Sequence, residues 1–285
     1  MFTFLFLQRR RLAFGAFFFF LSGLLMFENG GIGGIVTVSV LFTLICTTLA
    51  AIGIYFFPNY RQVWEIVGVT FFGMRAVEAL NPPFLAGLPV IEGAWSIVLI
   101  CLGYTLLFHA TYGAWWEKTS LSLRFTCTSR FRATVLPEKA WRHLVPDAAD
   151  PKRHYSGTLA AFDAPGNDPA QKVQKLRVGK EQFTEIHIRI LEDDGHSRFA
   201  YGPADPETGE RVEGFHWSLT LAPAAMGSTD VTVIEKNDGL PVNHALLCWF
   251  DDLGGQTGHS MQRFLEGRRD PTLLAWLRRD FAEAA

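Results

Sequence analysis

The hydrophobic pattern of the chain changes near residue 118. Before this point long stretches are uncharged, and residues 12–27 and 35–57 contain no Asp, Glu, Lys or Arg. Beyond it, charged residues are frequent and apolar residues recur at short periods. Apolar stretches of roughly 20 residues are typical of helices that cross a lipid bilayer. The pattern therefore predicts a membrane region at residues 1–118 and a water-soluble domain at residues 119–285.

Four apolar segments predict four membrane-spanning helices, at residues 12–27, 35–57, 63–80 and 94–112. The third segment contains Glu65, Arg75 and Glu78. Glu65 lies near its start, so we expect this residue at the membrane interface. Arg75 and Glu78 are three residues apart and share one face of a helix. A transport path is one explanation for this pair, but its position close to the end of the segment favours an ion pair near the outer interface.

Basic residues predict the orientation of these helices. Three arginines at residues 9–11 precede the first segment, Arg61 lies between the second and third, and Lys118 follows the fourth. The connections at residues 28–34 and 81–93 contain no Lys or Arg. The positive-inside rule therefore places both termini in the cytoplasm. No small-x-small cleavage site follows the first segment, so we do not expect a cleaved signal peptide.

From residue 121 onward, apolar and polar residues alternate, which is typical of half-buried β-strands. The longest alternation covers residues 121–135, and a short helix with Pro137 in its first turn is expected at residues 137–141. Further strands are predicted at residues 155–162, 172–178, 183–192, 197–202, 211–222 and 231–236. The domain is therefore expected to be a run of antiparallel strands.

Apolar residues at helical spacing predict a long helix over residues 243–266. Gly254 and Gly258 interrupt its apolar face, although glycine within a helix costs about 1 kcal/mol relative to alanine. Three explanations remain open: close packing of the helix on the sheet, room for a ligand, or a break into two helices at Gly254-Gly255. A last helix is predicted from Asp270.

Composition and motifs exclude several classes of function. The formal net charge of −2 argues against a nucleic-acid-binding protein, which needs a basic face. No Cys-x-x-Cys pair, His-x-x-x-His pair, phosphate-binding loop or Gly-x-Ser-x-Gly motif occurs. Asp251 and Asp252 could bind a metal, but adjacent helical residues point about 100° apart, so a solvated face is expected. We therefore predict no catalytic residue, metal or cofactor.

The order of elements resembles the helix-grip, or START-like (SRPBCC), superfamily, which includes polyketide cyclases and lipid-transfer domains. Residues 131–141, a strand that runs into the first helix, carry the resemblance together with the hairpin series and the helix at residues 243–266. The resemblance covers roughly residues 120–268. It implies a curved antiparallel sheet that grips a long C-terminal helix around an apolar cavity. Members of the superfamily bind lipids, sterols, polyketides or hormones, and only some are enzymes.

The expected fold is thus an α-helical membrane bundle of about four spans, followed by an α+β helix-grip domain with an extra C-terminal helix. We expect an integral protein of a bacterial inner membrane whose cytoplasmic domain binds a hydrophobic ligand, either a lipid or an isoprenoid- or polyketide-like molecule. The expected partners are the bilayer and this small molecule, without nucleic acid, and the oligomeric state stays open. The predicted pocket residues are Phe125, Tyr155, Ile186, Ile188, Tyr201, Phe215, Trp217, Gly254, Thr257 and Met261.

Two other functions remain open at this point. One is a cyclase- or dehydratase-type enzyme that acts on a membrane-soluble substrate, with inward Tyr or Thr side chains polarising a carbonyl group. The other is a module that binds a protein partner and has no cavity. A pair of inward acid and base residues would favour the enzyme, and the sequence offers no convincing pair.

Overall fold

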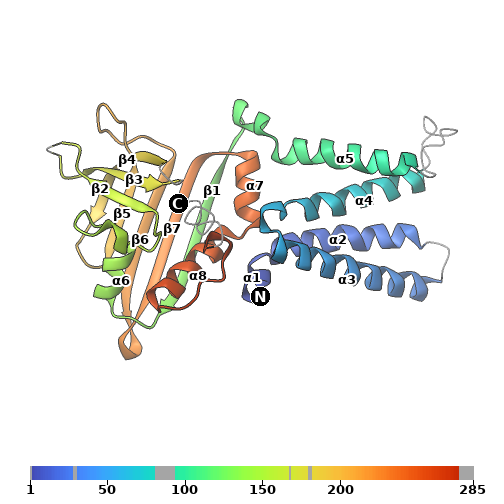
Figure 1. Ribbon diagram of the computed structural model, residues 1–285, viewed down its shortest axis with the longest axis horizontal. Coiled ribbons are helices and arrows are strands. Elements are labelled where there is room, and N and C mark those ends of the chain that lie inside the picture. The colour runs from blue at the N-terminus through green and yellow to red at the C-terminus, as the bar shows by residue number, and fades with distance from the viewer. Residues whose placement is uncertain (1, 28–30, 81–93, 167, 179–181, 276–285) are drawn as a thin grey trace. The chain divides into compact units, whose positions relative to one another are not determined.

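The computed structural model describes residues 2–27, 31–80, 94–166, 168–178 and 182–275 (Figure 1). The chain divides into two compact units. Unit 1 contains residues 1–120 together with residues 246–251, and unit 2 contains residues 121–245 and 252–285. The return of residues 246–251 to the N-terminal unit was not predicted from the hydrophobic pattern.

Unit 1 is built of helices. They are α1 (Phe2–Leu7), α2 (Arg9–Met26), α3 (Ile32–Phe56), α4 (Val63–Leu80) and α5 (Ala94–Tyr112), with the short 3-10 helices η1 (Pro58–Tyr60) and η2 (Ala114–Lys118). Helix α2 packs against α3 and α4, and α4 packs against α5 (Figure 1). All four predicted apolar segments are helical, and the third and fourth have the predicted bounds. The predicted connection at residues 81–93 lies outside the described residues.

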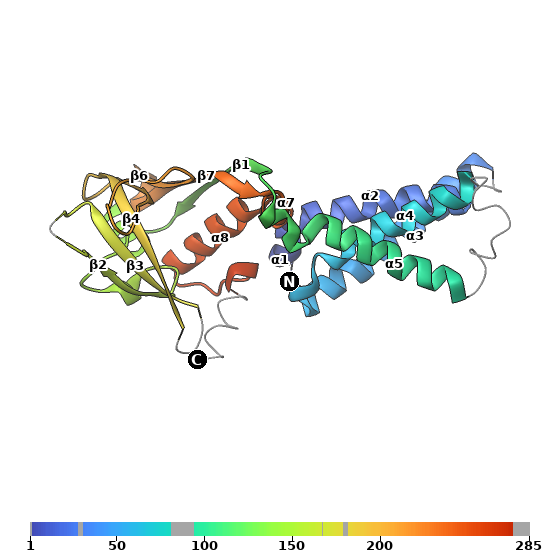
Figure 2. The same ribbon diagram turned by 90° about the horizontal axis from the view of Figure 1, so that it is seen from above.

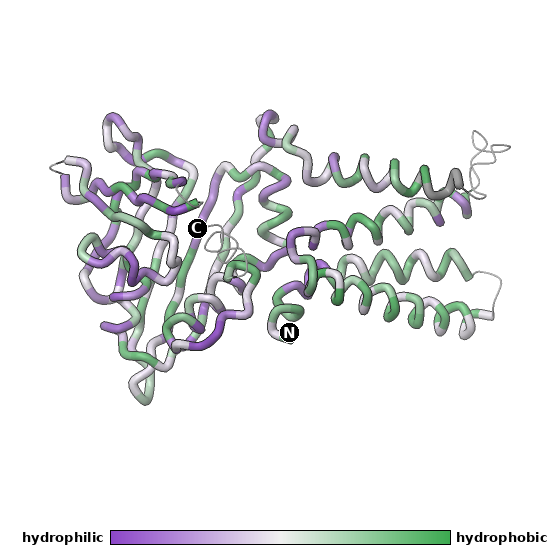
Figure 3. Tube along the Cα trace, viewed as in Figure 1, coloured by the Kyte–Doolittle hydropathy of each residue, from purple (hydrophilic) through white to green (hydrophobic). Residues whose placement is uncertain are grey.

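One helix of the described part of the chain, α3, is long and apolar enough to cross a membrane by length and composition. Large apolar side chains of α3 are exposed along its length: Leu41, Leu44, Ile45, Leu49 and Ile52. Figure 3 shows apolar residues along most of α2, α3, α4 and α5 as well. Exposed apolar surface of this extent is unusual in a water-soluble unit and is typical of a surface that contacts lipid or another protein.

A buried cluster of charges holds residue 251 within unit 1. Arg11 forms ion pairs with Glu65 and with Asp251, at 2.9 Å from Nε to Asp251 Oδ1. Arg61 Nη2 lies 2.8 Å from Asp251 Oδ2, and the Tyr112 hydroxyl donates to Glu65 at 2.5 Å. We call these five residues the charge cluster. The cluster makes Glu65 a buried residue of the helix bundle.

The expectation of a solvated face at residues 251 and 252 is wrong. Asp251 and Asp252 are each only 7% exposed. The reason is that Asp251 pairs with Arg11 and Arg61. The helix also breaks here, close to the break considered at Gly254-Gly255, and Asp252 adopts a left-handed backbone conformation with φ of 49°. The predicted ion pair of Arg75 and Glu78 is present, with 2.5 Å between Nη1 and Oε2.

Unit 2 contains a seven-stranded sheet with the order β1-β7-β6-β5-β4-β3-β2, in which every neighbouring pair is antiparallel. The strands are β1 (Ser122–Ala133), β2 (Leu159–Asp163), β3 (Gln171–Arg177), β4 (Phe183–Asp193), β5 (Arg198–Pro203), β6 (Phe215–Ala224) and β7 (Ser228–Pro241). Figure 2 shows that the sheet is curved and that α8 (Leu253–Leu265) lies along its concave side. This architecture is consistent with the expected helix-grip fold.

Three strands differ from their predicted bounds by four or more residues at one end, and one of them, β6, begins at Phe215 rather than at residue 211. Strand β7 is much longer than residues 231–236, because it pairs with β6 from Ser228 to Asn237 and with β1 from Thr229 to Pro241. Its polar end, from Asn237 to Gly239, lacks strand propensity, so tertiary pairing decides its structure. Strand β2 begins late, because Tyr155 belongs to a turn and its backbone N–H donates to His143 O at 2.9 Å.

The predicted helix at residues 243–266 is two helices, α7 (Val242–Phe250) and α8, and the break precedes Gly254. A Cβ added to Gly254 would lie 2.9 Å from both the Cys127 Sγ and the Thr128 carbonyl oxygen. Close packing on β1 therefore explains this glycine, and Ser129 Oγ donates to the Gly254 carbonyl at 2.7 Å. Most of the helix predicted from Asp270 lies outside the described residues.

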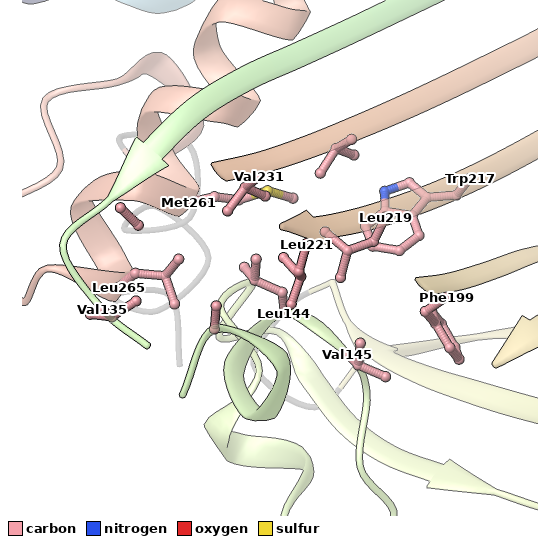
Figure 4. Packing of buried hydrophobic residues seen from close by; sticks show 13 residues of the cluster. Val135, Leu144, Val145, Phe199, Trp217, Leu219, Leu221, Val231, Met261 and Leu265 are labelled. Carbon is pink, nitrogen blue, oxygen red and sulfur yellow. The ribbon is translucent and has the colours of Figure 1, made fainter. Parts of the chain in front are cut away.

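The main core of unit 2 lies between the concave face of the sheet and the helices α6 (Pro137–Leu144) and α8. Its buried members include Leu144, Phe199, Trp217, Leu219, Leu221, Val231, Met261 and Leu265. Figure 4 shows Met261 and Leu265 from α8 near Leu144 from α6 and the side chains of β6. This core fixes the position of α8 over the sheet.

Candidate functional site

Five side chains form a row across the concave face of the sheet. The strand register pairs Ile190 with Tyr201, Tyr201 with Trp217, Trp217 with Glu235, and Glu235 with Cys127. Directly opposed residues of neighbouring strands project from the same face. Trp217 is a buried member of the main core, so this face is the inner one. We call these five residues the cross-strand row.

Glu235 is the acidic member of the row. The Trp217 indole, its cross-strand neighbour, forms a side-chain hydrogen bond with it. Burial raises the pKa of the Glu235 carboxyl, and the hydrogen bond from Trp217 only partly opposes this shift. The carboxyl group therefore keeps its proton to a higher pH than an ordinary glutamic acid, and in that form it can donate a hydrogen bond.

Tyr201 is the second polar member of the row and stacks on Trp217, with ring centroids 5.3 Å apart and 25° between the planes. The buried side chain of Gln174 hydrogen-bonds its hydroxyl group. Burial raises the pKa of this hydroxyl, and Tyr155 and Glu235 raise it further. Tyr201 therefore remains a neutral hydroxyl throughout the physiological range of pH, within the electrostatic reach of Glu235.

The structure brings most of the predicted pocket residues together. Tyr155, Tyr201, Phe215, Trp217 and Met261 all belong to the main core of unit 2 or pack against it. A smaller neighbouring core includes another of the predicted residues, Ile188, and Tyr201 packs against this core too. The two cores are therefore joined through Tyr201.

Phe125 and Phe215 lie next to the cross-strand row, because both pair with Asn237 of β7. Ile186 is 39% exposed and pairs with Gln174 of β3. Gly254 and Thr257 are buried on α8, and Gly254 is in close contact with β1. The structure therefore places these last two residues at the contact between helix and sheet.

Sequence reasoning missed Glu235 and Gln174, although a signal for Glu235 was present. Val231, Val233 and Glu235 recur at spacing two within one strand, so they share a face. Val231 and Val233 are buried in the core. A titratable side chain with a raised pKa among apolar neighbours is a candidate for a functional role.

Three surface cavities lie away from the row. One of about 270 Å³ lies between α4 and α5 and is lined by residues such as Thr70 and Tyr104. Another of about 350 Å³ adjoins α6, and a third of about 170 Å³ adjoins β3 and β4. Within the described part of the chain, no group of three or more His, Cys, Asp or Glu side chains is placed to bind a metal ion.

No protein-family model matches the chain, and no curated protein matches it. Solved structures resemble its C-terminal half. A START superfamily protein from Mycobacterium smegmatis is 13% identical with a TM-score of 0.37, and the match covers 50% of this chain and 94% of that chain. The Zhui aromatase/cyclase from a Streptomyces species is 9% identical with a TM-score of 0.36, over 50% of this chain and 94% of that chain.

A protein from Cytophaga hutchinsonii is 21% identical with a TM-score of 0.35, over 52% of this chain and 97% of that chain. At such low identities and TM-scores, these likenesses concern the fold of the C-terminal half. They carry no conclusion about a ligand or an activity, since one fold serves many functions.

Proposed function

We propose that the chain is an integral membrane protein whose C-terminal domain binds a hydrophobic small molecule between the concave face of the sheet and α8. The observation that carries this proposal is the cross-strand row. In it, the polar groups of Tyr201 and Glu235 lie on either side of Trp217, within an otherwise apolar interior. Apolar pockets with a few placed polar groups are typical of sites for small hydrophobic ligands.

The proposed ligand site uses the ten residues predicted from the sequence, extended by Glu235 and Gln174. Trp217 and Tyr201 provide the stacked aromatic surface, and Met261 approaches from α8. A lipid or an isoprenoid- or polyketide-like molecule has the matching apolar character. Its polar group would be oriented by the Glu235 carboxyl and the Tyr201 hydroxyl.

The proposed membrane region consists of α2, α3, α4 and α5, with both termini in the cytoplasm. Exposed apolar side chains of α3 support contact with lipid. The arginines at residues 9–11 and Arg61 support the orientation, because basic residues favour the cytoplasmic side. A hydrophobic ligand partitions into the bilayer. A binding domain that is anchored to the membrane can therefore take up this ligand directly from the bilayer, and the ligand does not have to cross water.

A second candidate function is catalysis by a cyclase- or dehydratase-type enzyme. Glu235 favours it, because a carboxyl group with a raised pKa can serve as a general acid at a higher pH than an ordinary glutamic acid. Both functions use the same site and differ in whether the bound molecule changes. Recovery of a chemically altered molecule after incubation with the protein would favour the enzyme.

The proposed site is tested with the full chain purified in a mild detergent. Trp217→Ala and Tyr201→Ala should each reduce the amount of lipid that the protein takes up from a lipid extract, measured by native mass spectrometry. Thr220→Ala is the matched control, because Thr220 is an exposed residue of the same strand as Trp217. Uptake that is unchanged in both variants, with the fold intact by circular dichroism, would contradict the site.

A further inference from the structure

Glu235 can select the chemical class of the ligand. Its carboxyl group lies between Trp217 and Cys127 across the strands, in the row that Tyr201 and Ile190 complete. All four of its companions in the row carry apolar or aromatic side chains. A charged carboxylate in such surroundings would lose its hydration without an equivalent replacement.

The hydrogen bond from Trp217 limits what Glu235 can offer a ligand. An indole N–H is a donor only, so it occupies an acceptor position of the carboxyl group. The protonated carboxyl retains one O–H donor, which pairs with a hydrogen-bond acceptor. The two influences that shift its pKa are burial, which raises it, and the Trp217 hydrogen bond, which lowers it. A neighbouring cation would instead favour the charged form.

Tyr201 adds a second neutral donor near the same place. Gln174 hydrogen-bonds the Tyr201 hydroxyl, and a hydroxyl group can both donate and accept hydrogen bonds. A ligand beside this row therefore meets the O–H donor of Glu235, the Tyr201 hydroxyl and the face of an indole. A carbonyl oxygen is the complement of an O–H donor. A ligand carboxylate would instead lose the hydration of its charge among these apolar and aromatic side chains, which disfavours its binding.

We infer that Glu235 donates a hydrogen bond to the carbonyl oxygen of an uncharged apolar ligand, such as a long-chain ketone, an ester or a quinone, and that the site discriminates against carboxylic acids. This inference rests on the proposed ligand-binding function and specifies its ligand class. Glu235 binds and orients the carbonyl group, with Trp217 holding the carboxyl in place.

The test uses the full chain in detergent and three probes of equal chain length: a methyl ketone, a primary alcohol and a carboxylic acid. Affinities are measured by native mass spectrometry and by competition. We expect the ketone to bind more tightly than the acid. Glu235→Leu should weaken the binding of the ketone about fivefold, which corresponds to the net free energy of a typical hydrogen bond. Glu235→Gln should preserve ketone affinity, because an amide N–H also donates.

The pH dependence separates hydrogen bonding from a merely structural effect. In the unchanged protein, ketone affinity should fall as the pH rises and Glu235 ionises, whereas in Glu235→Gln it should stay constant. This comparison remains available if Glu235→Leu fails to fold. Preference for the acid or the alcohol over the ketone, or identical pH profiles of the two proteins, would overturn the inference. Failure of all three probes to bind would instead contradict the proposed function itself.

Discussion

Loss of Asp251 should strongly destabilise unit 1. Its carboxylate accepts hydrogen bonds from Arg11 Nε at 2.9 Å and from Arg61 Nε and Nη2, at 2.9 and 2.8 Å. Together with Glu65, it balances the two guanidinium charges of the charge cluster. The Arg11 side chain has no exposed surface, whereas that of Arg61 is 13% exposed. Asp251→Ala therefore leaves two guanidinium groups, those of Arg11 and Arg61, with only the Glu65 carboxylate to balance them.

The expected loss of unfolding free energy is about 3 kcal/mol, at the lower end of the range for removing one partner of a buried ion pair. We place it there because Arg61 can turn towards solvent, while Arg11 cannot. Asp251→Asn should lose less, since it retains a hydrogen-bond acceptor. Replacement of Asp251 together with its more exposed partner, Arg61→Met with Asp251→Leu, should recover part of the loss, because Arg11 then keeps its ion pair with Glu65.

The matched control is Asp230→Ala in unit 2. Asp230 also pairs with an arginine, Arg132, at 2.6 Å, but the two side chains are 48% and 62% exposed. Exposed ion pairs contribute about 1 kcal/mol or less. Both variants are compared by denaturant unfolding of the full chain in mild detergent. If Asp251→Ala costs no more than Asp230→Ala, the charge cluster does not stabilise the protein as described.

Acid should weaken the same interaction. Burial alone raises the pKa of Asp251, but hydrogen bonds and charges from Arg61 and Arg11 outweigh it and hold the pKa below its ordinary value. The stability that depends on the charged carboxylate is therefore fully present above about pH 4, the ordinary value for aspartic acid. It is lost as the pH falls through the lower pKa of the folded state. Asp251→Asn should lack this acid-dependent loss.

Two further predictions concern unit 2. Burial raises the pKa of the Glu235 carboxyl in the folded protein. The stability that depends on its protonated form is therefore fully present below the ordinary pKa of glutamic acid and is lost as the pH rises through the raised pKa. Glu235→Gln should gain stability relative to the unchanged protein as the pH rises. A melting-temperature difference that does not change with pH would contradict this. Gly254→Ala should cost about 1 to 3 kcal/mol, because the new Cβ would lie 2.9 Å from Cys127 Sγ. Gly33→Ala in α3, with open space around the new Cβ, is the control and should not destabilise the protein in the same unfolding assay.

Much of the secondary structure could be predicted from the sequence, because local patterns determine it. Strand β4 alternates between apolar and polar residues from Glu185 to Ile190, and its predicted and observed bounds differ by one residue at the C-terminal end. Helices α4 and α5 are bounded by breaks in the apolar pattern. The polar end of β7 was missed, because β7 beyond Asn237 pairs with β1, a strand distant in the sequence, and no local pattern encodes such a pairing.

The features missed in the two units have different physical reasons. Asp251 was assigned to a solvated face because adjacent helical residues point about 100° apart, whereas distant arginines, Arg11 and Arg61, pair with it and residues 246–251 group with unit 1. Glu235 follows two inward valines at spacing two, so the strand pattern contained the information. Its contact with Trp217 depends on the register between β6 and β7, which alternation alone does not determine.

The central claim is that the domain holds a hydrophobic molecule beside the cross-strand row. The most direct test is native mass spectrometry of the full chain as purified in mild detergent, followed by extraction and identification of anything bound. We predict a discrete additional mass from an uncharged apolar molecule, reduced in Trp217→Ala and retained in Thr220→Ala. A chain that carries no additional mass and takes up none from a lipid extract would contradict the claim and favour a module that binds a protein partner.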